Sequence, residues 1–134
     1  MPDEAECLKA FTSMFGVLRS GGLLVLTAMP TDRQWKEKPR FHLVTNRRDF
    51  TRLFVVDYME CTARYNILDI FHSEDRNDLK EWSAELRVYL RDEQERLLKA
   101  SGFRHVDFFG SFDFTPYDKE VSNSLIAVAP KNTK

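Results

Sequence analysis

The chain has 134 residues, of which 43% are hydrophobic and 31% are charged, a composition ordinary for a soluble globular protein and unlike that of a disordered chain. Its 20 Lys and Arg residues nearly balance 21 Asp and Glu residues, so the net charge is −1, which argues against a broad nucleic-acid-binding surface. We expect a single domain over residues 1–134. The longest apolar stretch, Leu23 to Met29, is too short to cross a bilayer.

The first predicted element is a helix. Asp3 is suited to cap its N-terminus, Arg19 falls in its last turn, and Gly21-Gly22 ends it. Its apolar stripe, at spacings typical of one helix face, consists of Leu8, Phe11, Phe15 and Leu18.

The next element is an apolar strand. Leu23–Ala28 is a continuous apolar run without alternation, which predicts a strand of an α/β sheet that is covered on both faces. Pro30 ends this strand. Residues 31–52 then carry seven basic and three acidic residues, a local net charge of +4, so the neutral total hides a basic segment.

The middle of the chain has a β pattern. Strands are expected at Phe41–Thr45, Leu53–Met59, Ala63–His72 and Trp82–Leu90, with a polar turn at Ser73–Asp78. Alternating apolar and polar residues predict an antiparallel meander with one solvated face. The last segment could instead be helical, because Trp82, Leu86 and Tyr89 also fit one helix face.

The last part of the chain returns to an α/β pattern. Asp92 is suited to cap a helix, with Glu95 completing a capping box and Gly102 ending the helix. Strands are expected at Phe103–Phe109 and Ser124–Ala129. The loop Gly110–Asn123 between them is rich in Phe and Tyr.

Three segments match, in chain order, the elements of one enzyme family. Leu18–Leu26 has the pattern L-[KR]-x-G-G-x-L-hydrophobic, Leu97–Phe103 has L-x-x-[AS]-G-F, and Ser124–Lys131 ends in Ala-x-Lys. This ordered set resembles the class I S-adenosylmethionine-dependent methyltransferases. In that family the first segment joins a late helix to the fifth strand, the second leads into a sixth strand, and the third is the terminal strand. The resemblance implies an α/β fold, the C-terminal part of a Rossmann-like methyltransferase sheet with helices. Residues 30–90 would be an inserted antiparallel β meander that covers the substrate as a lid.

The cofactor site of that family lies in its N-terminal half, in a Gly-rich loop and an acidic residue after the next strand. None of the five glycines here forms a GxGxG pattern. We therefore expect the chain to be the C-terminal half of such an enzyme: a fragment, a truncated product or one part of a split protein. S-adenosylmethionine would belong to the complete enzyme, and this chain alone would bind it weakly or not at all and would not catalyse methyl transfer.

The predicted function is thus the substrate-covering part of a small-molecule methyltransferase. The alternative is a non-enzymatic binding or regulatory module that retains half of the fold. Expected partners are a small-molecule methyl acceptor and the missing N-terminal half or a partner chain, with homodimerisation through the exposed sheet edge at Leu23–Ala28. A weaker third hypothesis is RNA binding by Arg40–Arg52 with Phe41 and Phe54 as stacking rings.

Aromatic residues are the candidates for a substrate wall. Trp35 and Tyr117 are favoured, because both are expected in loops, where functional residues concentrate. The full set consists of Trp35, Tyr58, Tyr65, Trp82 and Tyr117. Each of these rings is also suited to ordinary core packing.

Ionisable residues supply the other candidates. Among His42, His72 and His105, His42 is preferred as a general base, because it lies at the start of the expected lid. The substrate-binding candidate Arg40, with Arg47 and Arg48, could bind a carboxylate or phosphate, although such charged runs are commonly only solvated.

The two cysteines indicate no metal or redox site. Cys7 and Cys61 have no CxxC spacing, and the histidines have no HxxxH spacing, so no metal site is predicted. We expect two reduced cysteines in a cytoplasmic protein, with a single disulfide as the alternative.

Overall fold

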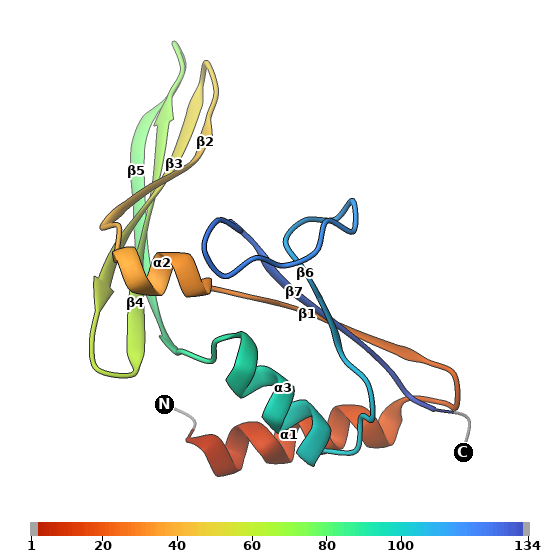
Figure 1. Ribbon diagram of the computed structural model, residues 1–134. Helices are drawn as coiled ribbons and strands as arrows, with labels where there is room; N and C mark the ends of the chain where they lie inside the picture. Colours follow the sequence, from red (N-terminus) through yellow and green to blue (C-terminus); the bar gives the residue numbers. More distant parts are fainter. Residues whose placement is uncertain (1–2, 133–134) are drawn as a thin grey trace. The chain divides into compact units, whose positions relative to one another are not determined.

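The computed structural model describes residues 3–132, which divide into two units (Figure 1). Residues 38–88 form one, here called the meander unit, and residues 3–37 with 89–132 form the other, here called the sheet–helix unit. The meander unit lies within the residues 30–90 expected for the insertion. The single domain over residues 1–134 stays a prediction.

The sheet–helix unit contains a three-stranded antiparallel sheet and all three helices. The strands are β1 (Leu23–Ala28), β6 (Asp107–Phe109) and β7 (Leu125–Pro130), and the helices are α1 (Glu4–Val17), α2 (Asp32–Glu37) and α3 (Arg91–Ala100). The strand order is β1-β7-β6, so β7 is central and β1 is an edge strand among the described residues. The β1–β7 ladder runs from Leu23 opposite Pro130 to Ala28 opposite Leu125.

The core of this unit lies between the sheet and the helices. Phe15 of α1 packs edge to face against the fully buried Phe103, with ring centroids 5.0 Å apart. The buried cluster consists of Leu98, Phe103, Val106, Phe108, Leu125, Ala127 and Ala129. Leu24, Leu26 and Ala28 of β1 pack against it, so this face of β1 is held by burial of apolar surface.

The start of α1 follows the sequence prediction, and its end does not. Asp3 and Glu6 form a capping box, in which each side chain accepts from the backbone N–H of the other residue. The helix ends at Val17, so the prediction that Arg19 lies in its last turn is wrong. Gly21 has a φ of 79°, and a Cβ on Gly22 would lie 2.9 Å from the Arg19 carbonyl oxygen. The Gly-Gly pair is therefore required by the tight turn into β1.

The prediction that β1 is covered on both faces is wrong for this chain. Its residues alternate between exposed and half-buried, and Leu23 and Val25 are 58% and 54% exposed. The core covers one face only, because Leu24, Leu26 and Ala28 pack against the buried cluster while Leu23 and Val25 do not. A short apolar run without alternation thus occurs here in a half-covered edge strand.

The meander unit is a four-stranded antiparallel sheet, as predicted. Its strands are β2 (Phe41–Asn46), β3 (Phe50–Tyr58), β4 (Thr62–His72) and β5 (Asn77–Arg87), in spatial order β2-β3-β4-β5. The helical alternative for residues 82–90 is wrong, because β5 pairs with β4 over its whole length, from Asn77 opposite His72 to Arg87 opposite Thr62. The fully buried Val56 and Ala63 lie on the central strands.

Three smaller expectations differ from the structure. Leu90, not Asp92, is the N-cap residue of α3, and its own side chain makes no capping hydrogen bond. The Arg91 backbone N–H, the first of the helix, donates instead to Oδ1 of Asp32 at 3.4 Å. The strand expected at Phe103–Phe109 is reduced to the three residues of β6. The basic segment contains the short helix α2, which was expected to be a loop. No helix within residues 3–132 is long and apolar enough to span a membrane.

Candidate functional site

The carboxyl end of β1 leads directly into α2 through a buried connection. The Met29–Pro30 peptide bond is cis, and Pro30 and Thr31 are both fully buried. The Thr31 N–H donates to Oε1 of Gln34 at 3.0 Å, and the Gln34 N–H donates to Oγ1 of Thr31 at 3.3 Å. These reciprocal bonds satisfy N–H groups at the start of α2 and fix the helix to the strand end.

Tyr117 holds the long loop against the start of α2. Its hydroxyl donates to Oδ1 of Asp32 at 2.6 Å and accepts from the Asp32 backbone N–H at 2.9 Å. Burial, together with the neighbouring Asp32 carboxylate, raises the pKa of the Tyr117 hydroxyl above its usual range. The hydroxyl is therefore a neutral structural donor at neutral pH. Its predicted place in a substrate wall stays a prediction.

Two more contacts tie α2 to residues 110–123. Arg33 donates a hydrogen bond to the Asn123 side chain, and Lys36 Nζ lies 3.6 Å from a carboxylate oxygen of Glu120. Trp35 lies on the same helix, and its backbone N–H donates to the Thr31 carbonyl oxygen at 2.9 Å. Trp35 and Tyr117, the two favoured wall candidates, therefore come from segments that are bonded to each other.

A small cavity lies beside this connection. Its volume is about 320 Å³, and it is lined by Thr27, Ala28, Met29, Phe112, Asn123, Ser124, Leu125 and Ile126. None of these residues is ionisable, so the cavity suits an uncharged or apolar group. Its lining residues come mainly from the carboxyl end of β1 and the start of β7.

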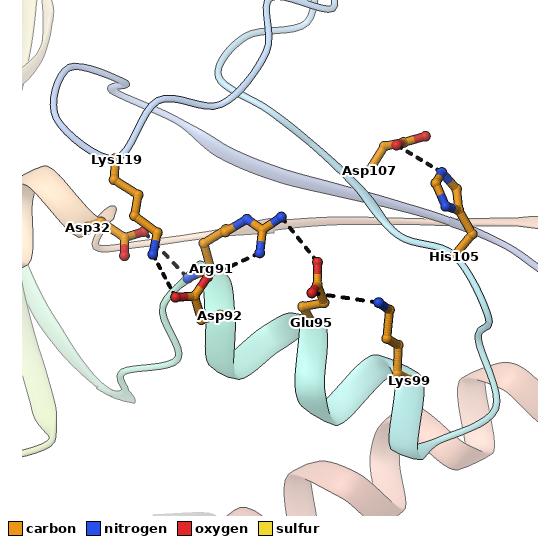
Figure 2. Close-up of polar contacts among 8 residues, drawn as sticks. All are labelled: Asp32, Arg91, Asp92, Glu95, Lys99, His105, Asp107 and Lys119. Carbon is orange, nitrogen blue, oxygen red and sulfur yellow. Dashed lines mark hydrogen bonds and ion pairs between the residues drawn. The ribbon is translucent and has the colours of Figure 1, made fainter.

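A polar network anchors the same loop to α3 (Figure 2). Lys119 lies 2.6 Å from Asp92, and this ion pair holds the pKa of the Asp92 carboxyl below its usual range. Arg91 pairs with Asp92 and Glu95, at 3.1 Å each, and its guanidinium lies 4.6 Å from the Phe108 ring centroid. The loop is thus fixed to α2 by Tyr117 and to α3 by Lys119.

The outer part of this loop contains a polar cluster that the sequence analysis missed. Asp113 accepts from the hydroxyls of Ser111 and Thr115 and from the Thr115 backbone N–H, which lowers its pKa to about 2. The neighbouring Phe112 and Phe114 are 77% and 71% exposed. The Ser-x-Asp-x-Thr spacing could have signalled this turn, because short polar side chains bond nearby backbone groups.

The remaining site candidates lie on the meander unit. Arg40 pairs with Asp57 at 3.0 Å, and the Tyr58 hydroxyl donates to the Pro39 carbonyl oxygen at 2.7 Å. Burial raises the pKa of Tyr58. His42 stands opposite Phe54 in the β2–β3 ladder. The structure therefore gathers Arg40 and Tyr58 at neighbouring positions.

Tyr65 and Trp82 have packing contacts. Tyr65 is only 3% exposed, packs edge to face against Phe54 at 5.7 Å, and has a pKa raised by burial. The Trp82 ring lies 5.7 Å from the guanidinium of Arg52. Their place in a substrate wall stays a prediction, as does that of the other candidates. Neither cysteine forms a disulfide, and no group of three potential metal ligands occurs within residues 3–132.

Comparison with known proteins gives a result at the level of the fold. No protein-family profile matches the sequence, and no curated protein matches it. Among solved structures, an S-adenosylmethionine-dependent methyltransferase from Clostridium acetobutylicum superposes with a TM-score of 0.77 at 11% identity, over 97% of this chain and 52% of that one. The CcbJ methyltransferase from Streptomyces caelestis gives 0.71 at 14% identity, over 94% and 53%.

A third similar structure is CalS10, an amino pentose methyltransferase from Micromonospora echinaspora solved with S-adenosylmethionine bound. It gives a TM-score of 0.65 at 16% identity, over 98% of this chain and 53% of that one. The chain thus has a partial class I methyltransferase fold, which confirms the resemblance found in the sequence. It spans about half the length of the solved structures that it matches.

The cavity beside β1 does not fit the cofactor of these enzymes by itself. S-adenosylmethionine carries a sulfonium, an amine, a carboxylate and ribose hydroxyls, which all need polar or charged partners when buried. The lining offers only Thr27, Asn123 and Ser124 as polar side chains, and none of them is charged. The described residues at this strand end therefore do not make a cofactor site on their own.

Proposed function

We propose that this chain is the C-terminal, substrate-covering part of an S-adenosylmethionine-dependent methyltransferase that acts on a small molecule. The observation that supports this most directly is the match of nearly the whole chain to about half of each methyltransferase structure. S-adenosylmethionine would supply the methyl group in the complete enzyme, within a site completed by an N-terminal half that carries the Gly-rich loop. Since the chain lacks that loop, it would be inactive alone.

The exposed face and edge of β1 support a missing partner segment. Leu23 and Val25 present apolar surface that the described residues leave uncovered. The edge of β1 away from β7 has no paired strand within residues 3–132. Unpaired edges and apolar faces favour association. We propose that the N-terminal half or a partner chain covers them, with a homodimer through the same edge as the state of the isolated chain.

The residue roles expected from the sequence belong to this proposal. The meander unit would cover the methyl acceptor and would contribute Arg40, Tyr58 and Tyr65 as substrate-binding residues and His42 as the base. The substrate-binding candidates of the sheet–helix unit are Trp35 and Tyr117. In a displacement at a methyl carbon the protein contributes orientation, exclusion of water and removal of a proton from the acceptor. One matched structure acts on an amino pentose, so a sugar-like acceptor is a reasonable first substrate to test. We place the protein in the cytoplasm.

Calorimetric titration of the chain with S-adenosylmethionine tests the proposal. We expect no binding by the chain alone, and binding once the protein segment encoded in frame upstream is added. Tight binding by the chain alone would contradict the half-enzyme hypothesis. Absence of binding with the upstream segment present would favour the alternative, a non-enzymatic module that retains half of the fold.

A surface variant sharpens this experiment. Val25→Asp places a charge on the exposed face of β1, so the chain alone should keep its stability within about 1 kcal/mol. The same charge would be buried in the assembled protein, so complementation by the upstream segment should fail. Lys9→Asp, a charge change on the exposed surface of α1, is the matched control and should leave complementation unchanged.

A further inference from the structure

A second cavity lies at one end of the meander sheet, where two turns meet. It has a volume of about 470 Å³ and is lined by Arg47, Asp49, Phe50, Arg52, Asp69, Phe71, Ser73 and Arg76. The turn between β2 and β3 is closed by the Arg47 N–H donating to the Phe50 carbonyl oxygen at 2.8 Å. The turn before β5 is closed by the Ser73 N–H donating to the Arg76 carbonyl oxygen at 2.9 Å. We call this cavity the arginine groove.

Two phenylalanines hold the guanidinium groups in place. Phe50 and Phe71 are directly paired across β3 and β4, with ring centroids 5.1 Å apart. The Arg47 guanidinium lies 5.5 Å from the Phe50 centroid, and that of Arg76 lies 3.8 Å from the Phe71 centroid. A guanidinium that lies over a ring is attracted to the ring face without using an N–H group in a hydrogen bond to another side chain, so these groups can donate to an anion.

Arg52 has a different role, because it forms the fixed wall of the groove. Its Nε and one terminal nitrogen each donate to Asp69 at 2.7 Å, and the Asp69 side chain is only 6% exposed. The bidentate bond from Arg52 holds the pKa of the Asp69 carboxyl below its usual range. This pair is internally neutralised, so it shapes the groove and does not repel a ligand of either charge.

Arg47 and Arg76 are therefore the cations that face a ligand. Arg47 makes no ion pair within the part of the chain that the structure describes. Arg76 pairs with Asp78 at 3.2 Å, but both side chains are about half exposed, and such a pair exchanges readily for a stronger anion. Asp49 is the carboxylate of the lining that would oppose an anion.

We propose that the arginine groove binds the oxyanion group of a small molecule, and that it prefers a phosphate monoester to a carboxylate. The guanidinium groups of Arg47 and Arg76 come from two turns and together offer more N–H donors than the two oxygens of one carboxylate can accept. A phosphate monoester has three terminal oxygens and a larger negative charge, so it can bond to both groups at once. The cavity volume also falls in the range of small-molecule sites. This inference stands on the meander unit alone and does not depend on the proposed function.

Three probes with the same ring test the preference: phenyl phosphate, benzoate and phenol, titrated into the full chain and followed by NMR of the arginine side chains. Phenyl phosphate should bind saturably and shift the Nε–H signals of Arg47 and Arg76. Benzoate should bind about tenfold more weakly, since it loses the hydrogen bonds to one charged donor. Phenol should not shift either signal.

Four variants assign the site. Arg47→Ala and Arg76→Ala should each weaken phenyl phosphate binding by about tenfold. Asp49→Asn should strengthen it, because it removes the opposing charge. Arg64→Ala is the matched control, since Arg64 lies on the same sheet outside the groove in a long ion pair with Glu85 of 3.9 Å, and it should change binding less than about twofold.

Several outcomes would overturn the proposal. One is no saturable shift with phenyl phosphate in a chain whose NMR spectrum shows it folded. Another is equal loss of affinity in Arg64→Ala and Arg47→Ala, which would indicate unspecific charge attraction. A third is a single-stranded RNA that binds more tightly than phenyl phosphate and loses that affinity in Arg47→Ala, which would make the groove a nucleic-acid site. If benzoate binds as tightly as phenyl phosphate, the preference for phosphate is wrong.

Discussion

Lys131 donates a hydrogen bond from Nζ to the carbonyl oxygen of Leu18 at 2.7 Å. The same ammonium donates to the carbonyl oxygen of Phe15 at 2.9 Å and lies 4.6 Å from the Phe15 ring centroid. It therefore satisfies carbonyl groups at the end of α1, where the helix dipole also favours a positive charge. The lysine of the Ala-x-Lys pattern thus has a structural role in this chain: it fastens the end of β7 to α1.

Removal of this ammonium should destabilise the sheet–helix unit. We expect Lys131→Met to lower the free energy of unfolding by about 1–2 kcal/mol, because two carbonyl groups lose a charged donor while the aliphatic part is retained. Urea denaturation followed by circular dichroism measures this. Lys99→Met is the control, since Lys99 is half exposed and lies 3.6 Å from Glu95. An equal effect of both variants would contradict the capping role.

A pair of glycine variants tests the packing of α1. Gly102 has a φ of 125°, and a Cβ there would lie 2.9 Å from the Phe15 ring. Gly102→Ala should therefore destabilise the chain by about 2 kcal/mol, through backbone strain and displacement of the ring. Gly16→Ala adds a Cβ with nothing within 4 Å, in the last turn of α1, and should stabilise it by about 0.5 kcal/mol. In thermal melting we expect Gly102→Ala to lower the melting temperature and Gly16→Ala to raise it.

The Tyr117–Asp32 contact predicts an alkaline loss of stability. The folded-state pKa of Tyr117 is raised above its ordinary value of 10.0. The neutral phenol therefore contributes its full stability below pH 10, and that contribution is lost as rising pH ionises the tyrosine of the unfolded chain first. Tyr117→Phe should cost about 1–2 kcal/mol at neutral pH. It should also flatten the fall of stability above pH 10, measured by urea denaturation at a series of pH values.

Because the Asp69 carboxylate is buried, removal of its partner Arg52 alone should destabilise the chain more than removal of both charges. Arg52→Met leaves Asp69 without its bidentate partner, and the urea midpoint should fall clearly, whereas Arg52→Met with Asp69→Leu should recover most of the loss. The pKa of Asp69 is lowered by Arg52. The contribution of the pair is thus present above the ordinary carboxyl pKa of 3.8 and is lost as the pH falls below it. Failure of the double variant to recover would contradict this reading.

Local signals were read correctly where the residues that form an element lie next to each other in sequence. The Asp3 N-cap, the Gly21-Gly22 turn and the four strands of the meander are of this kind. In each, a short-range bond or a cross-strand ladder between consecutive strands determines the structure.

Predictions that depended on distant contacts were less accurate. Asp92 has the sequence of a helix cap, but it pairs with Lys119 from the long loop, and the helix begins one residue earlier at Arg91. The apolar run of β1 predicts cover on both faces, and only a tertiary structure can show that one face is exposed. The Arg47–Phe50 and Phe71–Arg76 contacts likewise form only after β3 and β4 pair.

The position of β7 also determines when the sheet–helix unit can form during synthesis. The only strand that pairs with β1 within residues 3–132 is β7, whose register places Leu23 opposite Pro130. The pairing of β1 with β7 therefore forms only after Pro130 has been synthesised, whereas each hairpin of the meander can close as soon as its second strand emerges. We therefore expect the hairpins of the meander to form before the β1–β7 ladder does.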